Sequence, residues 1–320
     1  MDNPVVKRIV LVAAALAVVA GAAAVVIAVL DDAAPRQPGA VAAAGVAAAG
    51  GRFDVDQTES LSLDGVQSID VEVVSSDVTV TENADGTARV RLYGAVSSNR
   101  STAVPELVAE RRGATASFRV DYKSISVMAG WCRADLKLEV AIPRDYRGAL
   151  VVHGVSADVV IPADRTFTDL EIHTVSGDVD LGACTAGSFR CRTVSGDLKA
   201  RGVAAKSVDL VSTSGAMNVA GLTGDLTART VSGELELAWR GFSGQVDVST
   251  TSGRVTLAIP AGSGFRLDAS STSGRITSDH DVVVRGSASG PGRRSLSGDV
   301  GSGAGSVRVR TVSGEIRIAK

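Results

Sequence analysis

The sequence predicts an all-β protein: a parallel β-solenoid (β-helix-like) of about nine rungs, preceded by one N-terminal transmembrane helix. Three observations point to this fold class. A twelve-residue pattern centred on Ser-Gly recurs seven times, apolar and polar residues alternate on both sides of each Ser-Gly pair, and a run of 22 residues near the N-terminus carries no charge. A repeat this regular is typical of stacked architectures in which each unit contacts only its neighbours.

The charge-free run covers residues 9–30 and would span about 33 Å as a helix, close to the roughly 30 Å of a bilayer core. Two basic residues, Lys7 and Arg8, precede the run, and two acids follow it. The positive-inside rule therefore predicts a single-pass protein of the cell membrane, with residues 1–8 in the cytoplasm and the rest of the chain outside.

A signal segment is the alternative interpretation of this run, because the small residues 22–24 suit a cleavage site. The run exceeds the usual apolar stretch of about 7–15 residues in a signal peptide, which favours the anchor. Both interpretations give the same compartment. Residues 31–52 are rich in Ala, Gly and Pro and predict a tether, and residues 53–320 then form the β-solenoid domain.

The seven copies align when the Ser of each pair is taken as position zero. Their corner pairs are Ser176-Gly177, Ser195-Gly196, Ser214-Gly215, Ser232-Gly233, Ser252-Gly253, Ser273-Gly274 and Ser313-Gly314. Six residues before Ser, each copy has an apolar residue: Leu170, Phe189, Val208, Leu226, Val246, Leu267 and Val307. Apolar positions are even-numbered before the pair and odd-numbered after it.

Period-2 alternation predicts half-buried strands, and the change of parity predicts that the chain turns a corner at Ser-Gly while its apolar face stays inward. We expect glycine there for backbone conformations closed to other residues. Thr or Ser stands two residues before each corner Ser, and we expect these hydroxyls to hydrogen-bond along the stack.

Two degenerate copies, residues 69–80 and 150–161, bring the count to nine. Nine rungs spaced about 4.8 Å apart would stack to roughly 43 Å. Three further alternating segments, residues 89–96, 117–122 and 135–142, are expected to close the N-terminal end.

Residues 279–306 interrupt the repeats near the C-terminus. We expect an excursion there, not a rung. The last copy would then form the terminal edge of the stack, protected by Arg308, Arg310, Arg317 and Lys320 or covered by the excursion.

The segments TVSGDVDL, RTVSGDLKA, RTVSGELEL and SLSGDVGSGAGSVRVRTVSGEIRI resemble the bacterial putative adhesin family of β-strand-repeat proteins with Ser-Gly-Asp repeats. The resemblance covers roughly residues 55–318. It implies a β-solenoid, often tethered to a membrane, with members linked to cell-envelope stress responses. It brings no catalytic residues with it.

Acidic residues recur two positions after the corner Ser, among them Asp158 and Asp178. Stacked carboxylates suit a cation, but the Gly-Gly-x-Gly-x-Asp spacing of calcium-binding rolls is missing, so solvated acids are the preferred interpretation. His153 and His173 share one outward column and are a second candidate for a metal. A structural zinc site usually needs four ligands, so we expect neither a metal nor another cofactor.

Three cysteines allow at most one internal disulfide. A Cys184–Cys191 disulfide is one alternative, and a small buried hydrophobic residue is the other for Cys191. Neither looks like a catalytic thiol.

The composition favours binding over catalysis. Aromatic residues make up 3% of the chain, whereas sugar clefts use aromatic platforms, so a polysaccharide-active β-helix enzyme is the least favoured class. The net charge of −2 disfavours nucleic acid. We expect a membrane-anchored, extracytoplasmic, non-enzymatic binding or scaffold module, adhesin-like, whose partners are the bilayer through residues 9–30 and an envelope polymer or a membrane protein. An envelope-stress sensor acting through a membrane partner is the alternative.

Overall fold

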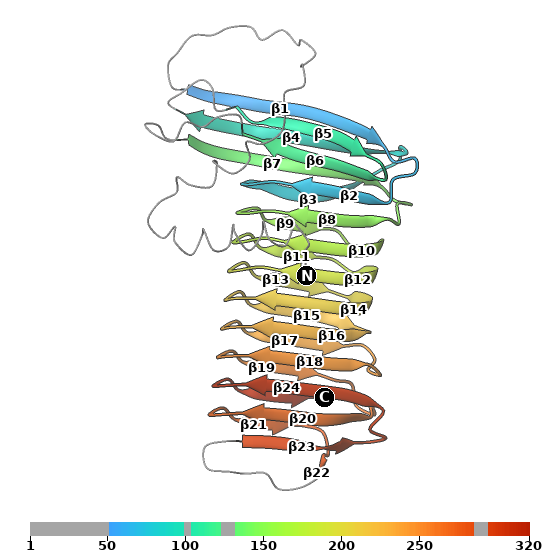
Figure 1. Ribbon diagram of the computed structural model, residues 1–320, viewed down its shortest axis with the longest axis vertical. Helices are drawn as coiled ribbons and strands as arrows, with labels where there is room; N and C mark the ends of the chain where they lie inside the picture. Colours follow the sequence, from blue (N-terminus) through green and yellow to red (C-terminus); the bar gives the residue numbers. More distant parts are fainter. Residues whose placement is uncertain (1–50, 99–103, 123–131, 285–293) are drawn as a thin grey trace.

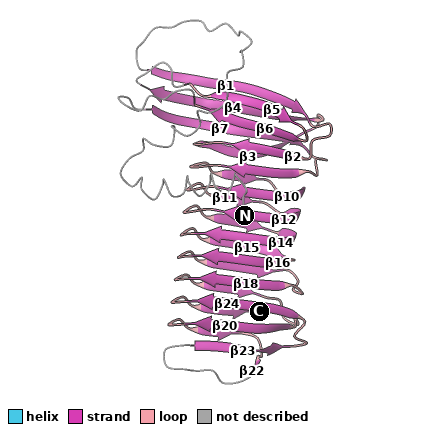
Figure 2. Cartoon of the chain, in the orientation of Figure 1, coloured by secondary structure: helices cyan, strands magenta, loops and turns pink. Residues whose placement is uncertain are grey.

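The chain is built from strands that stack into two sheets along an elongated molecule (Figure 1). The computed structural model describes residues 51–98, 104–122, 132–284 and 294–320. Within these ranges all regular structure is strand (Figure 2), in one sheet of 12 strands and one of 13.

Nine two-strand rungs make up most of both sheets in the described ranges. The first strands of the rungs lie in the 13-stranded sheet: β2 (Ser68–Glu72), β8 (Ala149–His153), β10 (Arg165–His173), β12 (Cys184–Arg192), β14 (Val203–Ser212), β16 (Asp225–Thr230), β18 (Gln245–Thr250), β20 (Phe265–Ser271) and β24 (Gly305–Thr311). The second strands lie in the 12-stranded sheet: β3 (Ser76–Asn83), β9 (Val159–Ile161), β11 (Val179–Leu181), β13 (Leu198–Arg201), β15 (Met217–Leu222), β17 (Leu235–Trp239), β19 (Val255–Ala258), β21 (Ile276–Ser278) and β25 (Ile316–Ala319).

The predicted alignment of the repeat copies is confirmed by the strand register. Leu170 lies beside Phe189, Phe189 beside Val208, and Val208 beside Leu226, all in parallel pairs. These side chains are at most 2% exposed and point between the two sheets. Every second residue of a rung strand is therefore buried, and the core is a column of apolar side chains.

An antiparallel cap closes the N-terminal end, where strands were predicted. In the 12-stranded sheet, β1 (Gly51–Ser62) and β7 (Cys132–Pro143) flank β4 (Thr87–Ser98) in antiparallel pairs, and β7 continues in parallel onto β3. In the other sheet, β5 (Glu106–Arg112) and β6 (Thr115–Asp121) form a hairpin beside β2.

The Gln57 side chain joins the edges of the two sheets at this end. Its amide donates to the Pro105 carbonyl (2.8 Å), and its carbonyl accepts from the Leu107 amide (2.7 Å). One side chain on β1 thus bonds to backbone groups at and just before the start of β5, on an open sheet edge.

The last rung does not lie at the end of the stack. Strand β24 pairs with β18 on one side and with β20 on the other, so the rung of residues 305–319 is inserted between two earlier ones (Figure 1). Strands β22 (Val283–Val284) and β23 (Arg294–Val300) come from the predicted excursion, and β23 covers β20 in an antiparallel pair. The prediction of a terminal edge formed by the last copy was therefore wrong, although the excursion does cover an edge.

A long connection and a glycine accommodate the insertion. Residues 259–264 join β19 to β20, whereas residues 182–183 suffice between β11 and β12, so the longer connection can pass over an extra rung. Gly305 begins the inserted strand directly against Phe242, where a Cβ would lie 2.6 Å from the ring. A larger residue could not enter there.

The predicted fold class, a parallel β-solenoid preceded by a transmembrane helix, was wrong. Both sheets are mixed, because antiparallel strands close each end of the parallel stack. The transmembrane part of the prediction is not supported either. No helix long and apolar enough to span a membrane occurs in the described part of the chain, and residues 9–30 lie outside it.

Candidate functional site

The Thr or Ser hydroxyls two residues before each corner Ser bond within their own rung. In each of the seven aligned copies, the side chain two residues before the corner Ser accepts the N–H of the corner Gly. The distances are 2.6–3.1 Å, and the accepting residues are Thr174, Thr193, Ser212, Thr230, Thr250, Ser271 and Thr311. Our expectation that these hydroxyls bond along the stack was wrong as a general rule, because each one satisfies a buried amide of its own rung. Ser271 bonds along the stack as well, since its hydroxyl also donates to the Gly314 carbonyl of the neighbouring rung, at 3.5 Å.

The corner glycines are required by close approach of neighbouring rungs. A Cβ on Gly196 would overlap the carbonyl oxygen of Gly177, and a Cβ on Gly215 would overlap that of Gly196. These glycines do not have positive φ, so the expected reason for glycine was wrong. What matters is the missing side chain.

Backbone hydrogen bonds connect each corner to the next. The Ser195 amide donates to the Val175 carbonyl and the Ser214 amide to the Val194 carbonyl, both at 2.9 Å. The inserted rung follows the same pattern, since Ser313 donates to Thr251 at 2.9 Å. The predicted corner residues thus form one continuous structural element.

The acids two residues after the corner Ser bond to the next rung. Carboxylate oxygens of Asp158, Asp178 and Asp197 each accept the amide of the residue stacked above, at 2.8 Å. Charged acceptors of this kind strengthen a hydrogen bond. The column therefore has a structural role. The sequence had suggested only two roles for these acids, as calcium ligands or as solvated side chains.

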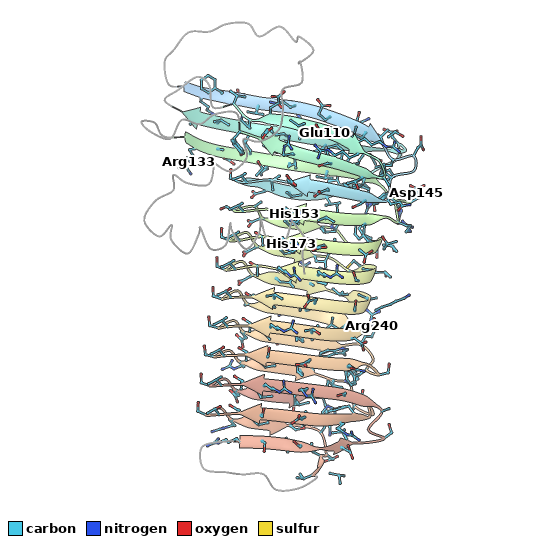
Figure 3. All side chains as sticks on the ribbon, in the orientation of Figure 1. Glu110, Arg133, Asp145, His153, His173 and Arg240 are labelled. Atoms are coloured by element: carbon cyan, nitrogen blue, oxygen red, sulfur yellow. The ribbon has the colours of Figure 1, made fainter. Side chains whose placement is uncertain are left out.

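The two candidate histidines are stacked on neighbouring rungs of the 13-stranded sheet (Figure 3). The His153 and His173 rings lie 5.0 Å apart at an interplanar angle of 22°. His173 Nε2 is 2.6 Å from Glu171 Oε1. That hydrogen bond is the main cause of the lowered pKa of Glu171, while burial, followed by the charge of His173, lowers the pKa of His153.

Asp70 and Glu72 on β2 extend this group, because β2 pairs with β8 and places Glu72 beside His153. Burial raises the pKa of Asp70 to about 6, and the charges of Glu72 and Glu171 add to the rise. Asp70 Oδ1 is buried without a hydrogen-bond partner in the described structure. Asp70, Glu72, His153, Glu171 and His173 are called the histidine–acid cluster below.

Within the histidine–acid cluster, Asp70 is the group suited to take up and release a proton near pH 6. On the far side of the cluster Arg190 lies 3.7 Å from Glu171, so a cation already faces the acids there. Within the described ranges no group of three or more His, Cys, Asp or Glu side chains is arranged to hold a metal ion. His173 is buried and Glu72 is exposed, while the other members of the cluster are half-buried, so the cluster reaches solvent through its edge.

Residues 66–319 match the domain family described as Toastrack DUF4097. The chain belongs to this family. No protein with a curated description matches the chain.

Solved structures show weak likeness to this Toastrack chain. A putative adhesin from Bacteroides fragilis is 17% identical, with 82% of this chain and 97% of that chain covered and a TM-score of 0.49. A putative lipid binding protein from Parabacteroides distasonis is 14% identical, with coverage of 83% and 97% and a TM-score of 0.44. With TM-scores this low, these neighbours say nothing about the function of the Toastrack chain.

The cysteines of the Toastrack domain do not form the disulfide we considered. Cys184 and Cys191 are buried free thiols on the same strand, β12. Seven residues of extended strand separate their Cα atoms by roughly 23 Å, far beyond the reach of a disulfide. Burial raises the pKa of each thiol to about 12, which leaves both protonated and unreactive.

Sequence reasoning missed Asp70 and Glu72 in the Toastrack domain. The signal was present, because in the aligned copies Asp70 falls in the column of Glu171 and Glu72 in that of His173.

Sequence reasoning also missed Arg165, whose side chain is 2% exposed and lies 3.7 Å from Glu82. That residue stands outside the repeat pattern, at the start of β10, so periodicity gave no sign of its burial.

We predict that Gly233→Ala destabilises the domain by about 2–4 kcal/mol, because the added methyl overlaps the Gly215 carbonyl and forces two rungs apart. Gly241→Ala is the matched control, since a Cβ there meets nothing within 4 Å and should change stability by about 0.5 kcal/mol or less. Urea unfolding measures both. Equal losses would show that close corner approach is not the reason for glycine.

We predict that Asp70→Asn stabilises the domain above pH 7 and loses this advantage as the pH falls towards 4. The folded protein favours protonated Asp70, whose pKa is raised from 3.8 to about 6, so its ionisation removes up to about 3 kcal/mol as pH rises through 6. Unfolding at pH 4.0 and 8.0 measures the difference, with Glu59→Gln on exposed β1 as the control. A loss of stability of equal size at both pH values would contradict the predicted role of this carboxyl.

Proposed function

We propose that the Toastrack domain of this chain is a non-enzymatic binding or scaffold module of the bacterial cell envelope. One observation carries the proposal. The parallel register holds outward side chains of successive rungs in straight columns, so a rigid surface presents regularly spaced polar and charged groups over its whole length. Such a surface suits an extended partner better than a small substrate.

Outward charges alternate in sign across neighbouring rungs. Arg190 lies 3.7 Å from Glu171, Arg192 lies 3.5 Å from Asp209, and Arg201 lies 2.6 Å from Asp180. Exposed pairs of this kind contribute little to stability, so they remain available to exchange partners with a bound polymer or protein. This supports a polar partner such as an envelope polymer or the outer part of a membrane protein.

The proposed location, outside the cytoplasm at the cell envelope, rests on the sequence. Lys7 and Arg8 precede the charge-free residues 9–30, and acids follow them. The basic flank favours the cytoplasmic side for the N-terminus and the outer side for the domain.

A second function, an envelope sensor that acts through a membrane partner, is favoured by the histidine–acid cluster. Asp70, with its pKa raised to about 6, changes charge within the range of an acidified envelope. The proton would alter the charge of the face that meets the partner. In this version the same surface binds, and protonation adjusts the binding.

We predict that the full chain, used as bait in gently solubilised native envelopes, retains a polymer or a membrane protein through its outer face. Arg190→Ser/Arg192→Ser removes two exposed charges of the 13-stranded sheet and should reduce retention about tenfold. Arg111→Ser/Arg112→Ser, in the β5–β6 hairpin of the cap, is the matched control. A retained polymer supports the adhesin-like module, and a stoichiometric membrane protein supports the sensor. Equal retention by both variants, or none by the native chain, would contradict binding through this face.

A further inference from the structure

The tips of the Ser-Gly corners carry a row of exposed apolar side chains. Eight large apolar side chains are exposed in the described structure, and four of them directly precede a corner Ser: Val74 (48%), Val194 (39%), Val231 (50%) and Val312 (51%). The same position in the other rungs also holds Val or Thr. Together with the neighbouring Ser column, these residues form what we call the corner strip.

The corner strip is long, straight and uncharged. Its nine rungs extend about 38 Å at the spacing of neighbouring strands. Neither of its two columns contains a charged residue. Amides of the strip already bond to carbonyls of the preceding rung, as Ser214 does to Val194 and Ser232 does to Thr213. The strip therefore presents methyl and hydroxyl groups, and exposed rows of apolar side chains are characteristic of contact surfaces.

The two flanks of the corner strip differ in net charge, one being mainly basic and the other mainly acidic. Three residues before the corner Ser, on the 13-stranded sheet, stand the bases Arg192, Arg229 and Arg310. Two residues after the Ser, on the other sheet, the same three rungs carry the acids Asp197, Glu234 and Glu315. Six of the nine rungs have an acid at this position, and two have a base, Arg254 and Arg275. Arg254 lies between two of the acids, 3.2 Å from Glu234 and 3.6 Å from Glu315, so the column as a whole stays acidic by net charge. The histidine rungs place His153 and His173 in the first column and Asp158 and Asp178 in the second, and the first rung places the acid Glu72 in the first column.

We propose that the corner strip is the interface of a parallel homodimer, with a second copy of this chain as its partner. A two-fold axis parallel to the stack, just outside the strip, sets two strips face to face with equivalent rungs at equal height. The rotation places the acidic flank of one copy beside the basic flank of the other. An interface of this kind is isologous, and one surface supplies both sides.

Charge complementarity selects this partner and this orientation. In register, Glu234 of one copy faces Arg229 of the second copy, Glu315 faces Arg310, and Asp197 faces Arg192. A two-fold axis perpendicular to the stack would instead place acidic flank beside acidic flank, which like charges oppose. The valines supply the apolar centre, and the charged rows supply the rim.

Sedimentation velocity of the full chain across a micromolar range tests the proposal. The native chain should approach the dimer mass, and Val231→Asp should weaken the dimer at least about tenfold, because a carboxylate would be buried without a partner. The matched control is Val160→Asp, since Val160 is 42% exposed on β9 and lies off the strip. A native chain that stays monomeric, or a dimer indifferent to Val231→Asp, would overturn the proposal. So would a monomer that binds phosphatidylcholine vesicles through these valines, since the strip would then serve a lipid surface.

Two further variants test the orientation. Arg229→Glu should weaken the dimer through repulsion by Glu234 of the second copy, and the double change Arg229→Glu/Glu234→Arg should restore it. Single cysteines at 194 and at 312 should each cross-link to themselves in the parallel arrangement, with V160C as the control. An antiparallel dimer could cross-link identical residues at one height only, so failure at both positions would contradict the parallel axis.

Discussion

The close approach of backbones at the Ser-Gly corners is the constraint on which the stack depends. A Cβ at any of the seven corner glycines would overlap backbone of the rung beside it. Because the glycines have no side chain, three successive amides at each corner can reach hydrogen-bond acceptors. The Ser amide donates to a carbonyl of the neighbouring rung, and the Gly amide donates to the Thr or Ser hydroxyl of its own rung. In several rungs the next amide donates to an aspartate of the neighbouring rung. The corners therefore fix the spacing and register of both sheets.

The ends of the molecule follow a different principle, because a parallel stack leaves open edges. At the N-terminal end the antiparallel strands β1, β4 and β7 and the β5–β6 hairpin complete the two sheets. At the other end β23 covers β20, and the last rung lies inside the stack. The inserted rung makes the corner contacts on both of its sides, since Gly314 lies against Gly253 and Gly274 lies against Gly314.

The sequence predicted what depends on periodicity and missed what depends on long-range order. Alternation around Ser-Gly was enough to align Leu170, Phe189 and Val208, because register follows from which residues must face the core. The insertion of β24 between β18 and β20 could not be predicted, because all rungs share one pattern and any two can pair. The column of Asp70 could be found from the alignment, but its raised pKa could not, because that rise depends on burial in the folded structure.

The surface is best understood as two kinds of column. Charged and titratable columns on the sheet faces include the histidine–acid cluster and suit a polar partner. The uncharged corner strip, bordered by a mainly acidic column on one flank and a mainly basic column on the other, suits a second copy. Both surfaces are consequences of the same repeat, since each position of the pattern becomes a column when rungs stack.

Amide hydrogen exchange at the corners tests the account most directly. If the corners hold the stack together, the amides of Ser195, Gly196 and Asp197 will be as strongly protected as those of the adjoining strands β12 and β13, because all of them open only when rungs separate. Corner amides that exchange at the rate of an open loop, beside protected strands, would show that the strands alone hold the fold and would contradict the central role of the corners.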